Sequence, residues 1–328
     1  MSFIIDDLDD YDDPLTTKEY KMLKGNILLG LCCINNSLRG KNNKGIFCSR
    51  TCTRATFSVE KAMSLATQNI KDIIPLIKWN VDHNIHHLRL SSDIFPHYTD
   101  EETEPYNMDF CKGYLKAAGD YANSVKHRIT MHPCQINNVG AKERRVFDIT
   151  EADLSMHADI LDLMNIDENG ILCVHGGGTY GDKEGTMRRW VEQFDDLPTK
   201  VKRRLCIENC EKSYSVRDCL TIANQCKIPV IYDNHHYNCY SILHPNEKQE
   251  KIEDMMDEVI ESWGNRIPLF HISEQAEGKK IGAHSDYITH IPRHMLTVPY
   301  KYNCKLSIEV EAKAKEAAIL PLIERYDL

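Results

Sequence analysis

The sequence predicts one α/β domain built as a (β/α)8 TIM barrel, and three observations lead to this fold class. Apolar, strand-like runs alternate with helical runs from about residue 26 to the carboxyl end of the chain, which is the pattern of a parallel sheet covered by helices. The alternation occurs eight times, the number of strands that closes such a barrel. The 328 residues contain no linker or break in composition that would mark a second domain, and their number is normal for one barrel with insertions. A doubly wound open sheet is the structural alternative.

The predicted elements follow from where these runs begin and end. In chain order the strands cover residues 26–34, 85–91, 129–132, 171–175, 205–208, 229–233, 267–271 and 305–309. The predicted helices cover residues 58–80, 106–126, 151–165, 183–195, 215–227, 247–263 and 312–325. Ser58 is expected to cap the first of these helices, because its hydroxyl can accept a hydrogen bond from a free backbone amide. After the seventh strand, residues 273–302 predict a loop in place of a clear helix.

The charge of the chain is unevenly distributed. A net charge of −9 counts mildly against a nucleic-acid partner, because DNA-binding domains more often carry a basic face. However, residues 6–13 contain six aspartates, and such a run is usually disordered and lies away from any binding face. We therefore expect residues 1–25 to form an acidic, disordered tail and residues 26–328 to form the barrel domain. Basic clusters that could face DNA, or simply be solvated surface, occur at residues 142–145, 188–189 and 200–204.

The compartment is predicted from what the chain lacks. No run of about 18 apolar residues exists, and no basic segment followed by an apolar one opens the chain, so we expect neither a membrane span nor a signal peptide. An intracellular location, in the cytoplasm or another DNA-containing compartment, is the default expectation. The 13 cysteines are scattered, which favours reduced structural thiols. Cys48 and Cys52 could suggest a zinc site, but no second pair follows at a suitable spacing.

Residues of the kinds that bind metals stand at the ends of successive predicted strands. In a parallel barrel these ends meet at one mouth, which would gather His132, His175, Glu208, Asp233, His271 and Glu309, together with His236, His284 and Glu311 just beyond strand ends. Imidazole and carboxylate groups together suit Zn²⁺, Mn²⁺ or Fe²⁺. One such histidine alone is more often structural, but a series at successive strand ends is hard to obtain by accident. Because the set exceeds what one ion needs, we expect two or three ions, which could activate a water and stabilise a phosphodiester under attack.

Several short strings make the chain resemble the UV damage endonuclease family, whose barrel belongs to the superfamily of endonuclease IV and xylose isomerase. They occur in family order from about residue 26 to 325, and the ordered set is far more specific than any single string. The main ones begin at Gly30 (GLCCIN), Phe47 (FCSRTC), Arg89 (RLSSD), His132 (HPCQ), Val174 (VHGGG), Ile207 (IEN), Tyr232 (YDNHH), His271 (HIS), Ala283 (AHSD) and Glu311 (EAK).

The resemblance implies a repair endonuclease that acts on damaged double-stranded DNA. It implies cleavage of the backbone immediately 5′ of UV photoproducts, with a 3′-hydroxyl left behind, and it leaves open whether other lesions are also substrates. The implied metal ligands are His132, His175, Glu208, Asp233, His236, His271, His284 and Glu311, with Glu309 as the alternative last carboxylate and His97 as the candidate for a further histidine after the second strand. Glu208, His236 and His271 are assigned to catalysis. We expect a monomer with two or three divalent ions, Mn²⁺ first and Zn²⁺, Mg²⁺ or Co²⁺ as alternatives.

The DNA-binding residues implied by the resemblance include departures from the family pattern. Gln135 is kept, but Ile136 replaces the tyrosine that would probe the duplex beside it. An apolar wedge can still unstack bases, whereas aromatic stacking is lost. Leu269 stands where the family has a modified lysine, and Leu31 where it has a tyrosine. Asn35, Arg50 and Lys183 are the other expected DNA or phosphate contacts.

Two rival functions remain open at this point. One is another metal-dependent barrel enzyme, either an abasic-site nuclease or a sugar isomerase. The other is a lesion-binding protein without turnover. Oligonucleotides with abasic sites, aldose substrates and band shifts without nicking would separate them.

Overall fold

The computed structural model describes residues 15–328, and within them the predicted barrel is confirmed. Eight parallel strands pair in chain order and β8 closes onto β1. The strands are β1 (Ile27–Cys32), β2 (His87–Leu90), β3 (Arg128–Met131), β4 (Leu172–His175), β5 (Leu205–Glu208), β6 (Val230–Asp233), β7 (Leu269–Ile272) and β8 (Leu306–Val310). All eight coincide with predicted strands to within a few residues, so their carboxyl ends share one mouth.

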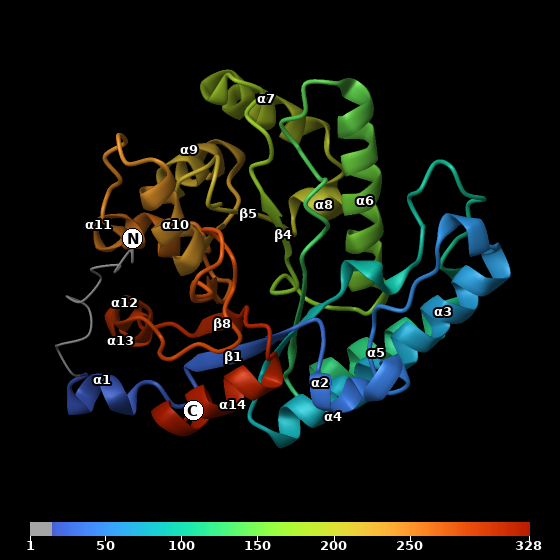
Figure 1. The fold of residues 1–328 in the computed structure, drawn as a ribbon, viewed down its shortest axis with the longest axis horizontal. Coiled ribbons are helices and arrows are strands. Elements are labelled where there is room, and N and C mark those ends of the chain that lie inside the picture. The colour runs from blue at the N-terminus through green and yellow to red at the C-terminus, as the bar shows by residue number, and fades with distance from the viewer. Residues whose placement is uncertain (1–14) are drawn as a thin grey trace.

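Helices surround this barrel, as Figure 1 shows, with α3, α4 and α5 together on one side and α9, α10 and α11 on the other. The α-helices are α1 (Thr17–Lys21), α2 (Asn36–Arg39), α3 (Val59–Lys71), α4 (Ile73–Asp82), α5 (Lys112–Ser124), α6 (Arg144–Leu163), α7 (Lys183–Asp196), α8 (Thr199–Lys202), α9 (Val216–Cys226), α10 (Asn234–Leu243), α11 (Ile252–Glu261), α12 (Arg293–Leu296), α13 (Val298–Tyr302) and α14 (Glu316–Tyr326). Four 3₁₀ turns lie in the connections, at Lys41–Asn43, Arg54–Thr56, Ser92–Ile94 and Asp109–Cys111. None of the helices in the described residues is long and apolar enough to cross a membrane.

Three differences from the predicted helices stand out. The predicted helix 58–80 begins at its expected cap, where the Ser58 hydroxyl accepts from the Lys61 amide, but it divides at Asp72 into α3 and α4. Pro75 lies in the first turn of α4 and has no amide hydrogen to continue the ladder from α3. Helix α6 begins seven residues earlier than expected, at Arg144. Helix α10, which was not predicted, begins directly after β6, with Asp233 as its N-cap.

The amino-terminal boundary also differs from the predicted one. The acidic run of residues 6–13 lies outside the described residues. Residues 17–21, which the sequence assigned to the tail, form the short helix α1, where Thr16 and Glu19 make a reciprocal capping box. Lys24 then forms an ion pair of 3.2 Å with Asp327, and α1 lies near the carboxyl end of the chain in Figure 1.

The interior of the barrel is chemically divided. On the side of β4 to β7 it is apolar, with a buried cluster made by Ile171, Cys173, Cys206, Ile231, Trp263 and Leu269. On the side of β2, β3 and β8 it is polar, and we call the buried or nearly buried set His87, Arg89, Thr130, Ser307 and Glu309 the polar half of the interior. Buried charges are stable only when they are paired, so this half needs a charge-balanced network. The network lies directly below the mouth.

Candidate metal centre at the barrel mouth

Glu208 is the centre of the side-chain cluster at the mouth. It ends β5 and is 1% exposed. Its Oε1 atom lies 2.9 Å from Nδ1 of His271 and 3.4 Å from Nδ1 of His236. Its Oε2 atom lies 3.1 Å from Nε2 of His132 and 3.7 Å from Nε2 of His175. The two oxygens of one carboxylate therefore face different imidazoles, which is the arrangement expected of a group that can bridge neighbouring cations.

Asp233 adds a second buried carboxylate beside Glu208. Its Oδ1 atom accepts a hydrogen bond of 2.6 Å from the His236 amide, because Asp233 caps α10. Its Oδ2 atom is buried and has no hydrogen-bond partner within the described part of the chain. Oδ2 lies 4.0 Å from Nδ1 of His271. A buried carboxylate oxygen without a donor is costly, and a cation at this position would satisfy it.

Backbone carbonyls orient two of the imidazoles. Nδ1 of His132 lies 3.1 Å from the carbonyl oxygen of Pro133, and Nδ1 of His236 lies 3.1 Å from that of Asn209. In each ring Nδ1–H can donate to the carbonyl, which leaves the lone pair of Nε2 free for a cation. Asn209 also bonds both backbone groups of Asp233, at 2.9 and 3.0 Å. The string Ile207-Glu-Asn209 thus fixes two strand ends at once.

Glu311 and His284 complete the set on the β8 side. Oε1 of Glu311 lies 3.8 Å from Nδ1 of His271, and Oε2 lies 3.7 Å from Nδ1 of His284. Glu309 lies deeper in the barrel, 3.1 Å from Nε2 of His271. The structure therefore brings together His132, His175, Glu208, Asp233, His236, His271, His284 and Glu311, and it places Glu309 beneath them.

The electrostatics of this cluster favour cations. Burial alone would raise the pKa of Glu208, but the neighbouring His175 and His271 outweigh it and hold that pKa well below its usual value. Burial, together with the charges of Glu208 and Glu311, raises the pKa of Asp233 to about 6. The cluster holds four carboxylates (those of Glu208, Asp233, Glu309 and Glu311), and the guanidinium of Arg89 contacts two of them, Glu309 and Glu311. Bound divalent ions would balance the negative charge of the others.

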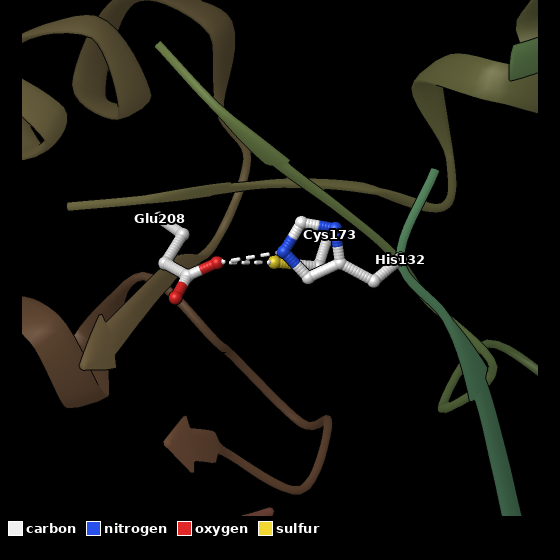
Figure 2. Close-up of side chains that lie close together, drawn as sticks. All are labelled: His132, Cys173 and Glu208. Carbon is white, nitrogen blue, oxygen red and sulfur yellow. Dashed lines mark hydrogen bonds and ion pairs between the residues drawn. The ribbon is translucent and has the colours of Figure 1, made fainter. Parts of the chain in front are cut away.

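Cys173 belongs to the cluster, although the sequence analysis left it among the structural thiols. Figure 2 shows its sulfur beside the ring of His132, with both directed at Glu208. The Sγ atom lies 2.9 Å from Oε2 of Glu208, and the ligand atoms of the three residues lie within 4.8 Å of one another. Burial raises the pKa of this thiol well above its usual value, so it donates a hydrogen bond to Glu208. Its position two residues before His175 on β4 places it on the same face of the strand, a signal that the sequence contained.

His97 is not brought to the cluster. Its Nε2 atom lies 2.7 Å from the carbonyl oxygen of Cys52, and its Nδ1 atom lies 3.0 Å from Asp100. Both ring nitrogens are therefore engaged in joining the loop after β2 to the loop after β1. The left-handed backbone at His97 (φ 55°) follows the η-turn that extends β2. The structure gives no support to its expected role as a metal ligand.

Asn35 and Arg50 occupy structural positions instead of an open surface. Asn35 is fully buried, and its Oδ1 accepts from the Leu38 amide as the N-cap of α2. Arg50 forms an ion pair of 2.7 Å with Asp72, donates to the carbonyl oxygen of Gly45 and stacks on the ring of Phe47. These contacts hold the loop after β1 against α3 and α4. Neither side chain is free to contact a phosphate in this conformation.

The remaining expected DNA contacts lie nearer the surface. Gln135 is exposed, and Ile136 is 68% exposed in the loop that follows His132. The side chain of Ile136 therefore packs little against the protein and is accessible to a partner. Lys183 begins α7, where its Nζ atom lies 2.6 Å from Asp218 and donates to the Tyr240 hydroxyl at 2.9 Å. Lys183 is thus paired within the protein, although 30% of its side chain is exposed.

The two leucines that depart from the family pattern are both buried. Leu31 lies in the main core outside the strand ring, and Leu269 lies in the apolar cluster inside the barrel. Apolar side chains and thiols surround Leu269, an environment that the sequence resemblance alone did not show.

The fold and the site together define a class: (β/α)8-barrel proteins with histidines and carboxylates gathered at the carboxyl ends of their strands. Endonuclease IV from Thermus thermophilus shares this fold, with a TM-score of 0.55 and 10% identity over 92% of this chain and 98% of that structure. The UV-endonuclease UvdE family matches residues 27–328, and the chain belongs to this family. The prediction of the family, and of a DNA endonuclease in preference to a sugar isomerase, is confirmed.

Individual relatives agree with this assignment. A UV-damage endonuclease of Schizosaccharomyces pombe is 34% identical over 317 residues, which are 92% of this chain and 51% of the relative. A protein of Acanthamoeba polyphaga mimivirus with a UV-damage endonuclease name is 32% identical over 92% of this chain and 91% of its own length. The crystal structure of SacUVDE has a TM-score of 0.78 and 28% identity, covering 92% of this chain and 98% of that one. The chain thus spans nearly all of some relatives and about half of the S. pombe protein.

Proposed function

We propose that this protein is a metal-dependent endonuclease that acts as a monomer on damaged double-stranded DNA, cutting 5′ of UV photoproducts and leaving a 3′-hydroxyl. The observation that supports it best is the buried convergence of four imidazoles on Glu208, with the unpartnered oxygen of Asp233 beside it. This donor set fits two or three divalent ions, of which Mn²⁺ is our first choice and Zn²⁺, Mg²⁺ and Co²⁺ are alternatives.

The residues divide the work of holding ions and substrate. Bound divalent ions would polarise the scissile phosphodiester and lower the pKa of the attacking water. Glu208 would bridge between ions, because its two oxygens face different imidazoles. His132 and His236 would offer Nε2 atoms, since backbone carbonyls engage their Nδ1 atoms. Glu208, Asp233 and His271 are buried, which strengthens their electrostatic interactions.

Recognition of the damage is assigned to the loop after β3. Ile136 is exposed and lies four residues from His132 in sequence, so a wedge at Ile136 would enter the duplex close to the cluster. Unstacking costs less where a lesion has already weakened the stack, and this difference would give selectivity. Gln135, exposed beside it, would supply polar contacts to the bases. The proposal gives no DNA-binding role to Asn35 or Arg50, and only a minor one to Lys183.

The test is a nicking assay on duplexes that contain one defined photoproduct, with Mn²⁺ and with EDTA. We expect cleavage 5′ of the photoproduct with Mn²⁺, none with EDTA, and none in Glu208→Gln. Cleavage that survives EDTA or this substitution would rule out the metal mechanism. Duplexes with one abasic site and aldose substrates test the rival enzymes. Lesion-specific band shifts without nicking at any divalent ion would instead favour a binding protein.

A further inference from the structure

We propose that Glu309 is a positioning residue of the metal centre: it neutralises Arg89 and so leaves Glu311 available to a cation. The inference rests on the proposed function, because it concerns the same cluster. It also favours Glu311, which directly follows β8, over Glu309 as the metal ligand.

The contacts of Glu309 leave it no free oxygen. Its side chain is 1% exposed. Oε1 accepts a hydrogen bond of 2.8 Å from the Thr130 hydroxyl and lies 3.2 Å from Nε2 of His87. Oε2 accepts a hydrogen bond of 3.1 Å from Arg89 and lies 3.1 Å from Nε2 of His271, at an angle that makes this last contact electrostatic. Protein groups therefore surround both oxygens, and a cation would have to displace them.

Arg89 is the residue that links the two carboxylates. One nitrogen of its guanidinium, Nη1, donates both to Oε2 of Glu309 and to Oε1 of Glu311. The side chain is 14% exposed, and its Nε atom is buried with no hydrogen-bond partner among residues 15–328. A guanidinium in this environment needs a negative partner, because its hydration is largely lost. With Glu309 neutral, Arg89 would have Glu311 as its one remaining anionic hydrogen-bond partner.

Because Glu309 and Glu311 share Arg89, Glu309 affects how strongly Glu311 can attract a cation. A carboxylate that carries the whole charge balance of a buried guanidinium attracts a second cation much less. Arg89 would also repel an ion at Glu311 if no other carboxylate offset its charge. Glu309 supplies that charge at the same guanidinium nitrogen that donates to Glu311. The pair Arg89–Glu309 is then internally neutral, and the charge of Glu311 is directed to the mouth.

The surrounding residues hold Glu309 in this position. The His87 ring lies between Ser307 and Thr130, with Nδ1 3.1 Å from one hydroxyl and Nε2 2.7 Å from the other. A side chain at Gly30 would collide with this ring, because a Cβ there would lie 2.7 Å from Nδ1 of His87. The glycine on β1 therefore provides the space that His87 needs beside β8. Through Thr130, the same scaffold fixes Oε1 of Glu309.

The competing interpretation is that the residues around Glu309 form a separate cation site below the mouth. Ligand atoms of Cys32, Glu309 and Glu311 lie within 4.8 Å of one another. However, Arg89 already donates to both carboxylates. An ion there would have to displace a buried positive charge. The guanidinium thus occupies the role that an ion would otherwise take.

The experiment measures Mn²⁺ affinity by the electron paramagnetic resonance of the free ion, together with thermal unfolding of the metal-free protein. We expect Glu309→Gln to weaken the affected Mn²⁺ site by about 10- to 100-fold, the range found when partners of metal ligands are removed. Glu316→Gln is the matched control, because Glu316 is a buried carboxylate that accepts from Asn36 and Ser37 away from the cluster. The control should leave Mn²⁺ affinity unchanged.

A double-mutant comparison tests the neutralising role itself. If Glu309 acts by balancing Arg89, its replacement should have little effect on affinity once Arg89 is gone, so R89M and R89M/E309Q should bind Mn²⁺ equally. An equal loss in both backgrounds would overturn the role of Arg89, and unchanged affinity in E309Q would overturn the proposal. If E309Q fails to fold, the comparison of R89M with R89M/E309Q decides alone. Absence of Mn²⁺, Zn²⁺ and Co²⁺ binding by the unaltered protein would instead refute the proposed function.

Discussion

Nδ1 of His271 lies 2.9 Å from Oε1 of Glu208, so the ends of β7 and β5 are joined across the mouth although β6 separates them in the sheet. The contact links two buried side chains, one 0% and the other 1% exposed. This contact therefore marks the place where bound ions should stabilise the fold.

Replacing His271 should remove most of the stabilisation that bound metal gives to the fold. At a Mn²⁺ concentration of 100 times the dissociation constant, binding stabilises a protein by about 2.7 kcal/mol, which is a rise of a few degrees in Tm for a chain of this size. We expect His271→Asn to lose most of that rise. Differential scanning calorimetry with Mn²⁺ and with EDTA measures it. An unchanged rise would show that the ions bind elsewhere.

Replacing Cys173 separates hydrogen bonding from packing. Cys173→Ser keeps a donor to Glu208, whereas Cys173→Val fills a similar volume without one. Loss of one hydrogen bond to a charged acceptor costs about 1.5–3 kcal/mol, so we expect Val to lower nicking and Mn²⁺ affinity by roughly 10- to 100-fold and Ser by much less. Equal behaviour of the two variants would assign Cys173 to packing alone.

Changing Ile136 should alter the response to lesions without altering the metal centre. The side chain is 68% exposed and packs little, so Ile136→Ser should leave Tm within about 1 °C. We expect its nicking of photoproduct duplexes to fall roughly 10-fold, and Ile136→Tyr to equal or exceed the unaltered protein because base–aromatic stacking contributes about 1–3 kcal/mol. Single-turnover assays with matched Mn²⁺ titrations test this. A fall in Mn²⁺ affinity would contradict it.

His97 should prove structural. Its ring joins the Cys52 carbonyl to Asp100, so His97→Gln should destabilise the protein by about 1–3 kcal/mol. The number of Mn²⁺ ions bound per chain should not change. Elemental analysis and urea unfolding of the same preparation give both quantities, and loss of one ion would restore His97 as a ligand.

His127 should make the fold sensitive to acid. Burial lowers its pKa to about 3 from an ordinary 6.5, so the unfolded chain takes up a proton below pH 6.5 that the folded chain refuses. Stability is therefore fully present above pH 6.5 and decreases as the pH falls towards 3. Between pH 7 and 5 the linkage relation gives a loss of about 2 kcal/mol from this group.

A His127→Gln variant should lose that much less stability over the same interval. The ring makes one long contact, 3.4 Å to Asn80, so little else changes. Urea unfolding of metal-free protein at pH 7 and pH 5 is the measurement. Parallel losses in both proteins would exclude His127 as the source.

The sequence predicted the barrel and most of its mouth, for physical reasons that particular residues illustrate. Strand ends at His175, Glu208 and Asp233 were placed correctly because buried parallel strands are short apolar runs and their carboxyl ends must converge. Helix α10 was missed because its first turn carries the cluster residues and its hydrophobic pattern is weak. The contacts of His97 and Arg50 could not be predicted, because hydrogen bonds within and between loops have no signal in sequence spacing.

The polar half of the interior could not be predicted for a related reason. Arg89 and Glu309 are distant in sequence, and their pairing depends on the closure of β8 onto β1 and the register of β2 beside it. Alternation along β8 placed Glu309 and Glu311 on one face. It could not show that one guanidinium, that of Arg89, contacts both of them.

The closure of β8 onto β1 also sets an order of events during synthesis. The cluster residues leave the ribosome in sequence from His132 to Glu311, and the last of them follows the final strand directly. A nascent chain can therefore hold only an incomplete set until Glu311 has been made. The full charge arrangement is assembled only when the eighth strand pairs with the first and the sheet becomes a ring.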